Sequence, residues 1–345
     1  MKYLLSTETF SVKELFNPHL KEKGNYYYYL LEKKGMSHKE AVNKIGIKPV
    51  WFAGVKDKNA KTTQWFCALE RIGDVDEDNF KIKYKGQSDE RIFVGKHKEN
   101  EFTISAELEE GEKESLKHFK TKKELICNYF GKQRFSEQNI EIIEALEKEA
   151  YENALRLFLT KRNKHDSEKS RAIKGLIEKK WEKWGEILAD EKITGTKKTE
   201  LFEFLEKNPA DFEGAFLHAE PKSVRIIIKA AQAKRFNAIL NELAEKKKPN
   251  NIHGEIVEQF GSYALGASKA FTRSISVAPT KFEQRFRKGT LDRKTFFTAE
   301  KFGYKIVEEN KIEFKFCLPR GTYATVFLKY LSAWLNNAKK QRKKD

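Results

Sequence analysis

One aspartate, Asp57, stands in a loop rich in Lys, Asn and Thr between two apolar runs. The runs at 50–53 and 65–69 are aromatic and too short for helices, so they predict two strands. The loop between them would hold the Asp57 carboxylate at the edge of a sheet. A carboxylate there can act as a nucleophile, can bind a metal ion, or can simply bond its own backbone in a turn.

The residues around Asp57 favour the first role by resemblance. Residues 54–64 follow the pattern Gly-x-Lys-Asp-x-x-Ala-x-Thr-x-Gln, which resembles the catalytic loop of the TruD family of tRNA pseudouridine synthases. Three more segments resemble motifs of that family, in the family's order: Phe-x-Val-x-Glu at 10–14, Asn-Tyr-Phe-Gly-x-Gln-Arg-Phe at 128–135 and Leu-Pro-x-Gly-Thr-Tyr-Ala-Thr at 318–325. A single such motif would be weak, but four in sequence make the resemblance specific.

The resemblance implies a reaction and the residues that carry it. Pseudouridine formation breaks the C1′–N1 bond of uridine, rotates the uracil and rejoins it through C5, without a redox step or a cofactor. By resemblance the nucleophile is Asp57, with the ribose and C6 of uracil both open as its target, and the substrate is uridine 13 of tRNA. The flipped-out base would lie against Phe10, Phe130 and Tyr323, and Asn128 would hydrogen-bond the uracil edge or the ribose.

Some positions depart from the family pattern. Family members usually carry a basic residue a few positions before Phe-x-Val-x-Glu, and Leu4 stands there in this chain. No basic partner of Asp57 is therefore assigned. The family's Gly-Asn-x-Phe segment begins with Glu99 here, and Ser136 replaces the glycine that usually follows Gln-Arg-Phe.

Two other functions compete with this interpretation. A non-catalytic RNA-binding protein on the same fold would not need Asp57 with its family neighbours. A nuclease or other hydrolase would need a second carboxylate, a histidine or a metal cluster near the first carboxylate, and apart from Glu14 in the segment at 10–14 the motif segments contain none. Both alternatives are therefore weaker than an isomerase.

The charge balance points to a polyanionic partner. The 345 residues include 68 Lys and Arg against 51 Asp and Glu, a net charge of +17. An acidic membrane surface would also fit that charge, but the basic residues are spread along the chain, which favours nucleic acid. No apolar run is long enough to span a membrane. The three cysteines and seven histidines lack metal-ligand or disulfide spacing, so we expect no metal and a cytoplasmic monomer.

The order of apolar patterns predicts the elements that position Asp57. Strands are expected at 25–31, 92–94, 102–105, 306–307 and 312–317, in addition to the two that flank Asp57. Helices are expected after a capping box at Ser37 and Glu40, at 112–127, through much of 137–215, at 224–243 and at 324–335. A loop at 246–251 and a disordered basic tail from Lys339 complete the prediction.

These elements predict an α+β fold with a helical insert. Residues 1–140 and 274–337 would form the two halves of a catalytic core, 141–273 the insert, and 338–345 the basic tail. The resemblance implies the same arrangement: a pseudouridine synthase core with a mainly antiparallel sheet, and a family-specific domain inserted into it.

Overall fold

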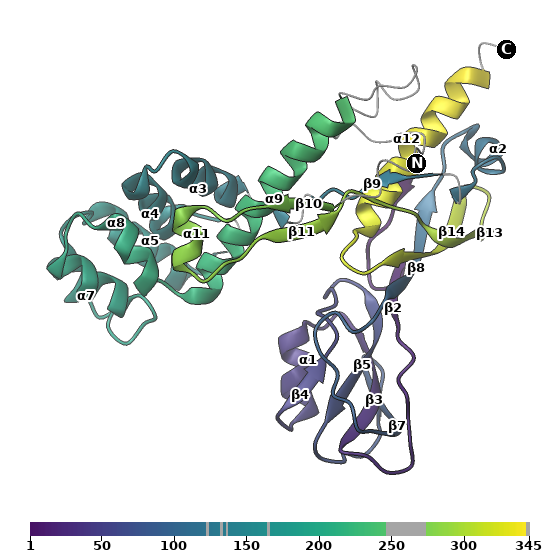
Figure 1. Cartoon of the computed structure of the whole chain (residues 1–345), viewed down its shortest axis with the longest axis horizontal. Helices are drawn as coiled ribbons and strands as arrows, with labels where there is room; N and C mark the ends of the chain where they lie inside the picture. Colours follow the sequence, from purple (N-terminus) through teal and green to yellow (C-terminus); the bar gives the residue numbers. More distant parts are fainter. Residues whose placement is uncertain (122–123, 132–133, 136, 164–165, 246–273, 343–345) are drawn as a thin grey trace. The chain divides into compact units, whose positions relative to one another are not determined.

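The chain folds into two compact units (Figure 1). The computed structural model describes residues 1–342 apart from 122–123, 132–133, 136, 164–165 and 246–273. Of these, the first unit contains Met1–Asn128, the residues 244–245 and the residues from Phe296 onward, and the second contains Tyr129–Leu243 and the residues from 274 to Thr295. The first unit therefore contains both ends of the sequence, and the second unit lies between them in sequence.

The first unit is built on a ten-stranded sheet. Its strands are β1 (Lys2–Tyr3), β2 (Phe10–Leu15), β3 (Tyr26–Lys34), β4 (Val50–Phe52), β5 (Lys61–Ala68), β6 (Val75–Glu77), β7 (Phe80–Ser88), β8 (Glu99–Glu107), β13 (Glu300–Ile306) and β14 (Lys311–Pro319). The main order is β13-β14-β8-β2-β5-β3-β7-β6, with β1 beside β8 and β4 beside β5. Among the described strands, only β2 and β5 pair in parallel.

Two helices pack on one face of this sheet. Helix α1 (His38–Ile45) begins at the predicted capping box of Ser37 and Glu40 and packs against Leu31 and Phe66. Helix α12 (Ala324–Arg342) packs on the other half of the same face, where Phe327 lies 4.5 Å from the ring of Phe316. Two small elements complete the unit: the short helix α2 (Glu112–Leu116), and strand β9 (Ile126–Cys127) paired with β12 (Phe296–Phe297).

The second unit is mainly helical. Its elements are α3 (Glu137–Glu147), α4 (Tyr151–Thr160), α5 (Glu168–Lys179), α6 (Trp184–Leu188), α7 (Thr199–Lys207), α8 (Phe212–Ala215), η3 (Phe216–His218), α9 (Pro221–Glu245), β10 (Ser274–Val277), α11 (Lys281–Arg285) and β11 (Leu291–Lys294). Apolar side chains of Trp184, Phe202 and Phe216 lie in its core. Phe282 of α11 joins them, 5.4 Å from the ring of Phe216.

The units differ from the expected domain boundaries. The second unit begins at Tyr129 rather than 141, because the Tyr129 hydroxyl and the Phe130 amide donate to Asn241 and Asn237 of α9 at 2.6 and 2.9 Å. It continues to Thr295 because β10 pairs with β11. The expected boundary at 273 and the expected loop at 246–251 lie outside the described residues.

Three predicted elements were wrong. Residues 92–94 form no strand: Ile92 is buried, while Phe93 and Val94 are 57% and 84% exposed, so the segment lacks the alternating burial of a strand. The helix expected at 112–127 ends at Leu116, and its last residues form β9 instead. Residues 339–342 are not disordered, because α12 continues to Arg342.

The other predicted strands outside the insert are present, with small shifts at their ends. Residue 306 ends β13 and 312–317 lie in β14, and the runs beside Asp57 form β4 and β5. The mixed architecture with a mainly antiparallel sheet confirms the predicted α+β class. Within the described residues, no helix has both the length and the apolar character needed to cross a bilayer.

Candidate functional site

Asp57 lies on the exposed loop that joins β4 to β5. Within the described residues, no hydrogen bond or ion pair occupies its carboxylate. The backbone of the loop, by contrast, is held from below by two buried lysines. The carboxylate can therefore meet a ligand while its main chain stays fixed.

The first of these lysines is Lys33, near the end of β3. Its side chain is 1% exposed, and its Nζ donates to the backbone carbonyls of Asp57 and Met36 at 2.9 and 2.7 Å. Burial lowers the pKa of Lys33, while the negative charges of Asp57 and Glu40 offset part of this effect. Lys33 is thus a basic residue close to Asp57. No basic partner of Asp57 was assigned from the sequence, because Leu4 stands where the family usually has a basic residue.

The second lysine, Lys56, points into the protein rather than alongside Asp57. Its Nζ lies 2.7 Å from Oε2 of Glu14 on β2, and both side chains are buried. Burial raises the pKa of Glu14, and the charge of Lys56 offsets part of that shift. A buried charge is tolerated when it is paired, so the pair ties the loop to the neighbouring strand.

The segment 95–98 connects the loop of Asp57 with the segment that carries Tyr323. The amide of Gly95 donates to the carbonyl of Ala53 at 2.7 Å. On the other side, the amide of Arg320 donates to the carbonyl of Lys98 at 2.8 Å, and its guanidinium donates to the carbonyl of Gly95. Two of the family-like motifs therefore meet through a segment that belongs to neither.

His97 lies at the centre of this connection. Its Nδ1 is 3.9 Å from Oε2 of Glu14, but burial, followed by the charges of Lys56 and Arg320, lowers the pKa of His97 to about 4. The imidazole is therefore neutral near pH 7. We read its approach to Glu14 as a packing contact and not as an ion pair.

The face of the sheet beneath the loop combines apolar and polar side chains in two neighbouring rows. Lys33, Thr62, Val12, Phe102 and Phe316 occupy one row across β3, β5, β2, β8 and β14.

The next row on the same face is largely polar. It places Gln64 opposite Leu31, and Glu14 opposite Asn100. Within the described residues, several buried atoms of these two rows lack a hydrogen-bond partner: Thr62 Oγ1, both amide atoms of Gln64 and Asn100 Oδ1. Since buried polar atoms are normally paired, these atoms form a surface that suits a polar ligand or water.

The predicted substrate-binding residues fall in different surroundings. Phe10 on β2 is 9% exposed and stacks on Phe102 with ring centres 6.3 Å apart. Tyr323 is half-buried, and its carbonyl accepts hydrogen bonds from the first turn of α12. Asn128 is buried directly after β9.

Phe130 belongs to the second unit. Its ring lies under the guanidinium of Arg293, at 4.0 Å, and meets Phe236 edge-on at 5.5 Å. Its backbone exchanges two hydrogen bonds with the side chain of Asn237. Gln133 of the same motif lies outside the described residues.

Sequence reasoning missed Lys33 and His97. Lys33 had a signal, because it falls at an inward position of β3, two residues after the buried Leu31. His97 had none, because the segment 95–98 is held by Ala53 and Arg320, which are distant from it in sequence. Among the described residues, no group of three His, Cys, Asp or Glu side chains could hold a metal ion.

The comparisons with known proteins agree with the four motifs. The family described as "tRNA pseudouridine synthase D (TruD)" matches residues 5–307. The chain belongs to the TruD family. This confirms the family that the motifs predicted.

Individual relatives support the same assignment. The chain is 29% identical to "tRNA pseudouridine synthase D" of Aquifex aeolicus, over 94% of this chain and 96% of the relative. It is 28% identical to "Probable tRNA pseudouridine synthase D 1" of Methanococcus maripaludis, over 73% and 69% of the two chains. The crystal structure of the putative TruD protein from Methanosarcina mazei matches with a TM-score of 0.64 and 17% identity, over 97% and 93% of the two chains. At that identity the match shows the fold alone.

Proposed function

We propose that this protein isomerises uridine to pseudouridine in tRNA, at position 13, with Asp57 as the nucleophile. The observation that carries the proposal is the state of the Asp57 loop. Its carboxylate is exposed and free of hydrogen bonds and ion pairs within the described residues, while Lys33 and the pair of Lys56 with Glu14 hold the loop. Such a loop presents a nucleophile in a fixed position.

The chemistry needs one carboxylate and no added group. Asp57 attacks either C1′ of the ribose or C6 of the uracil, and the C1′–N1 bond breaks. The uracil rotates, a bond forms between C1′ and C5, and the Asp57 carboxylate is released. The proton leaves C5 and N1 gains one, so that substrate and product have the same composition.

The uridine must leave its stack before Asp57 can reach it. Enzymes that act on a base hold the flipped base between aromatic or apolar side chains. We assign this role to Phe10, Phe130 and Tyr323, and hydrogen bonding of the uracil edge or the ribose to Asn128. The family motifs support these assignments, and Tyr323 is only half-buried.

The test of the nucleophile is Asp57→Asn. An amide keeps the shape of the side chain but is a poor nucleophile, so we expect pseudouridine formation to be lost while tRNA binding stays nearly unchanged. Tritium release from tRNA labelled at C5 of uridine measures turnover, and filter binding measures affinity. The matched control is Asp76→Asn, an exposed aspartate on β6 that pairs with Lys81.

The outcomes separate the candidate functions. Turnover by Asp57→Asn at a rate close to that of the wild type would refute Asp57 as the nucleophile. A wild-type protein that binds tRNA without making pseudouridine would support the alternative of a non-catalytic RNA-binding protein. Mapping of pseudouridine in the product tests position 13.

We also propose that the protein works as a cytoplasmic monomer. The three cysteines are buried free thiols, which suits a reducing compartment. Size-exclusion chromatography with light scattering should give a mass of about 40.3 kDa. A mass twice as large would contradict the monomer.

A further inference from the structure

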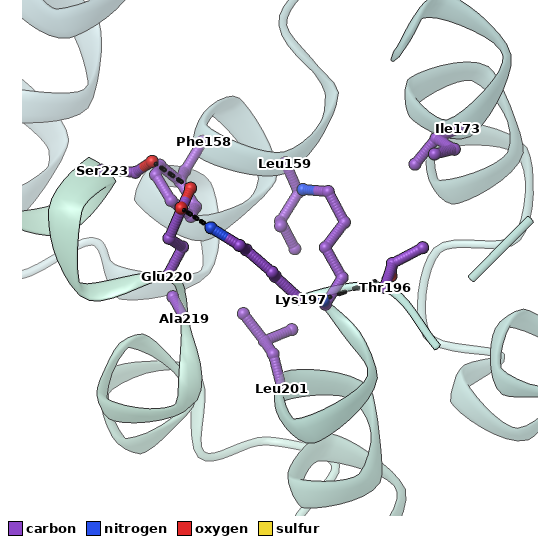
Figure 2. Close-up of a pocket in the computed structure, with 10 residues that line it drawn as sticks. Phe158, Leu159, Ile173, Thr196, Lys197, Leu201, Ala219, Glu220 and Ser223 are labelled. Carbon is purple, nitrogen blue, oxygen red and sulfur yellow. Dashed lines mark hydrogen bonds and ion pairs between the residues drawn. The ribbon is translucent and has the colours of Figure 1, made fainter. Parts of the chain in front are cut away.

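A pocket lies within the helical unit, between α4, α5, α7 and the start of α9 (Figure 2). Its volume is about 290 Å³. Apolar side chains form much of its wall: Phe158, Leu159, Ile173, Leu201 and Ala219. Small-ligand pockets usually measure about 300–1,000 Å³, so this one suits a single flat ring system better than a large molecule.

A carboxylate is fixed at one side of the pocket. Figure 2 shows Glu220 between Lys197 and Ser223: Lys197 Nζ lies 2.5 Å from Oε1, and the Ser223 hydroxyl donates to Oε2 at 3.0 Å. These hydrogen bonds lower the pKa of Glu220. The carboxylate is therefore ionised near pH 7, and each of its oxygens keeps a lone pair for a further donor.

A second lysine, Lys198, also lines the pocket. Within the described residues, no hydrogen bond or ion pair engages its Nζ. Burial, followed by the charge of Lys174, lowers the pKa of Lys198, and the negative charge of Glu220 offsets part of that shift. The pocket thus combines the Lys198 amine as a hydrogen-bond donor with the Glu220 carboxylate as an acceptor in an apolar setting. Within the described residues, no protein group accepts a hydrogen bond from the Lys198 amine.

We propose that this pocket binds one unpaired guanine base of the RNA substrate. Guanine carries two neighbouring donors, N1–H and the N2 amino group, next to the acceptors O6 and N7. The two donors match the Glu220 carboxylate, and the acceptors match Lys198. Phe158 and Leu201 supply apolar surface for the ring, as single-stranded RNA recognition commonly requires.

The choice of guanine follows from the donor count. Adenine offers one amino group and no ring N–H, and uracil offers a single N–H between two acceptors. Neither base presents paired donors to a carboxylate. The proposal rests on the proposed function, because it takes the RNA substrate as the source of the base.

The experiment is photo-crosslinking on the full chain. Unmodified tRNA transcribed with 6-thioguanosine is bound to the protein and irradiated, and the crosslinked peptides are identified by mass spectrometry. We expect a crosslink in the peptides that contain Phe158 or Leu201. In Lys198→Met the yield of this crosslink should fall about tenfold or more, as expected when a specific base contact is lost.

The control variants separate recognition from folding and from charge. Lys207→Met removes an equal charge from an exposed site on α7 outside the pocket, and should leave the crosslink unchanged. Lys198→Met removes a half-buried amine that makes no hydrogen bond or ion pair within the described residues, so its unfolding temperature should not fall. Glu220→Gln should abolish the preference of the crosslink for 6-thioguanosine over 6-thioinosine, which lacks the N2 amino group.

Several results would overturn the proposal. They are the absence of pocket crosslinks when tRNA is bound, an equal pocket crosslink from tRNA carrying 4-thiouridine, and an equal crosslink from free 6-thioguanosine monophosphate at the same concentration. The last result would assign the pocket to a free nucleotide. Because crosslinking needs no turnover, the Asp57→Asn variant gives the same readout, and failure here is distinct from failure of the proposed function.

Discussion

Two lysines with different contacts hold the loop of Asp57. Lys33 binds the backbone of the loop and adds a positive charge beneath it, whereas Lys56 forms an ion pair with Glu14. The alternation of side chains on β3 indicates the inward position of Lys33. The role of Lys56 has no such local signal, because it depends on the parallel pairing of β2 with β5, which brings Glu14 under the loop.

Replacing Lys33 should reduce turnover. Lys33→Met keeps the apolar stem but leaves the carbonyls of Asp57 and Met36 without their donor, and an unpaired buried group costs about 1–3 kcal/mol. If the active position of the loop is destabilised by a comparable free energy, kcat should fall about tenfold while KM for tRNA changes little. The control is Lys34→Met, on the next position of β3, whose side chain is 42% exposed. Equal kcat values in the two variants would contradict a role for Lys33.

Alanine variants of the two aromatic residues Tyr323 and Phe10 should differ in their unfolding temperatures. Tyr323→Ala removes one stacking partner, which costs about 1–3 kcal/mol of substrate interaction, and should lower turnover with little change in the unfolding temperature. Phe10 stacks on Phe102 in the core, so Phe10→Ala should lower both turnover and the unfolding temperature.

A conservative variant separates the two effects at Phe10. Phe10→Leu keeps most of the buried volume without the aromatic face, so a loss of turnover at unchanged melting would show that the ring meets the base. Tyr323→Ala with full stability and full activity would remove Tyr323 from the site. Thermal melting and tritium release on the same preparations measure both quantities.

At the scale of elements, the sequence predicts the helices and strands whose signal lies in residues that are neighbours in the chain. The two strands around Asp57, the capping box of α1 and the helix predicted at 224–243 depend on neighbouring residues, and all three are present. Strand β9 could not be predicted, because it exists only through its pairing with β12, which lies far along the chain. The conformation of the segment 95–98 could not be predicted for the same reason, because its contacts come from the start of the Asp57 loop and from Arg320.

His97 in that segment should make stability depend on pH. Its pKa is about 4 in the folded protein, against an ordinary value of about 6.5 in the unfolded chain. Between these values the unfolded state binds more protons, so the free energy of unfolding should fall as the pH falls from about 6.5 toward 4. Above pH 7 His97 should have no such effect.

The measurement is urea unfolding between pH 4 and pH 8 on wild type and His97→Gln. The glutamine does not titrate, so its profile should be flatter over this range. Glu14 acts in the opposite direction, because burial raises its pKa, and the comparison of the two proteins removes most of its contribution. Parallel profiles for the two proteins would show that His97 is not buried in its neutral form.

At the scale of the whole molecule, composition predicts the kind of partner but not where it binds. A net charge of +17 favours a polyanion, and charge alone does not specify a fold or a site. The motifs supplied the family, and with it the expected core and insert. The pocket in the insert has no motif, because its lining comes from four helical elements and its recognition groups are common residue types.

Binding of tRNA should be largely electrostatic. Each phosphate neutralised by a lysine or an arginine releases counterions, so affinity should fall by on the order of 10³ over a few-fold rise in salt if six or more contacts form. The last turn of α12 carries Lys339, Lys340 and Arg342, and it lies outside every family motif. Removing the chain from Lys339 onward should therefore weaken binding and flatten its salt dependence, while turnover at saturating tRNA persists. Filter binding between 50 and 200 mM salt measures both slopes, and an affinity of the full chain that stays constant over this range would contradict the electrostatic account.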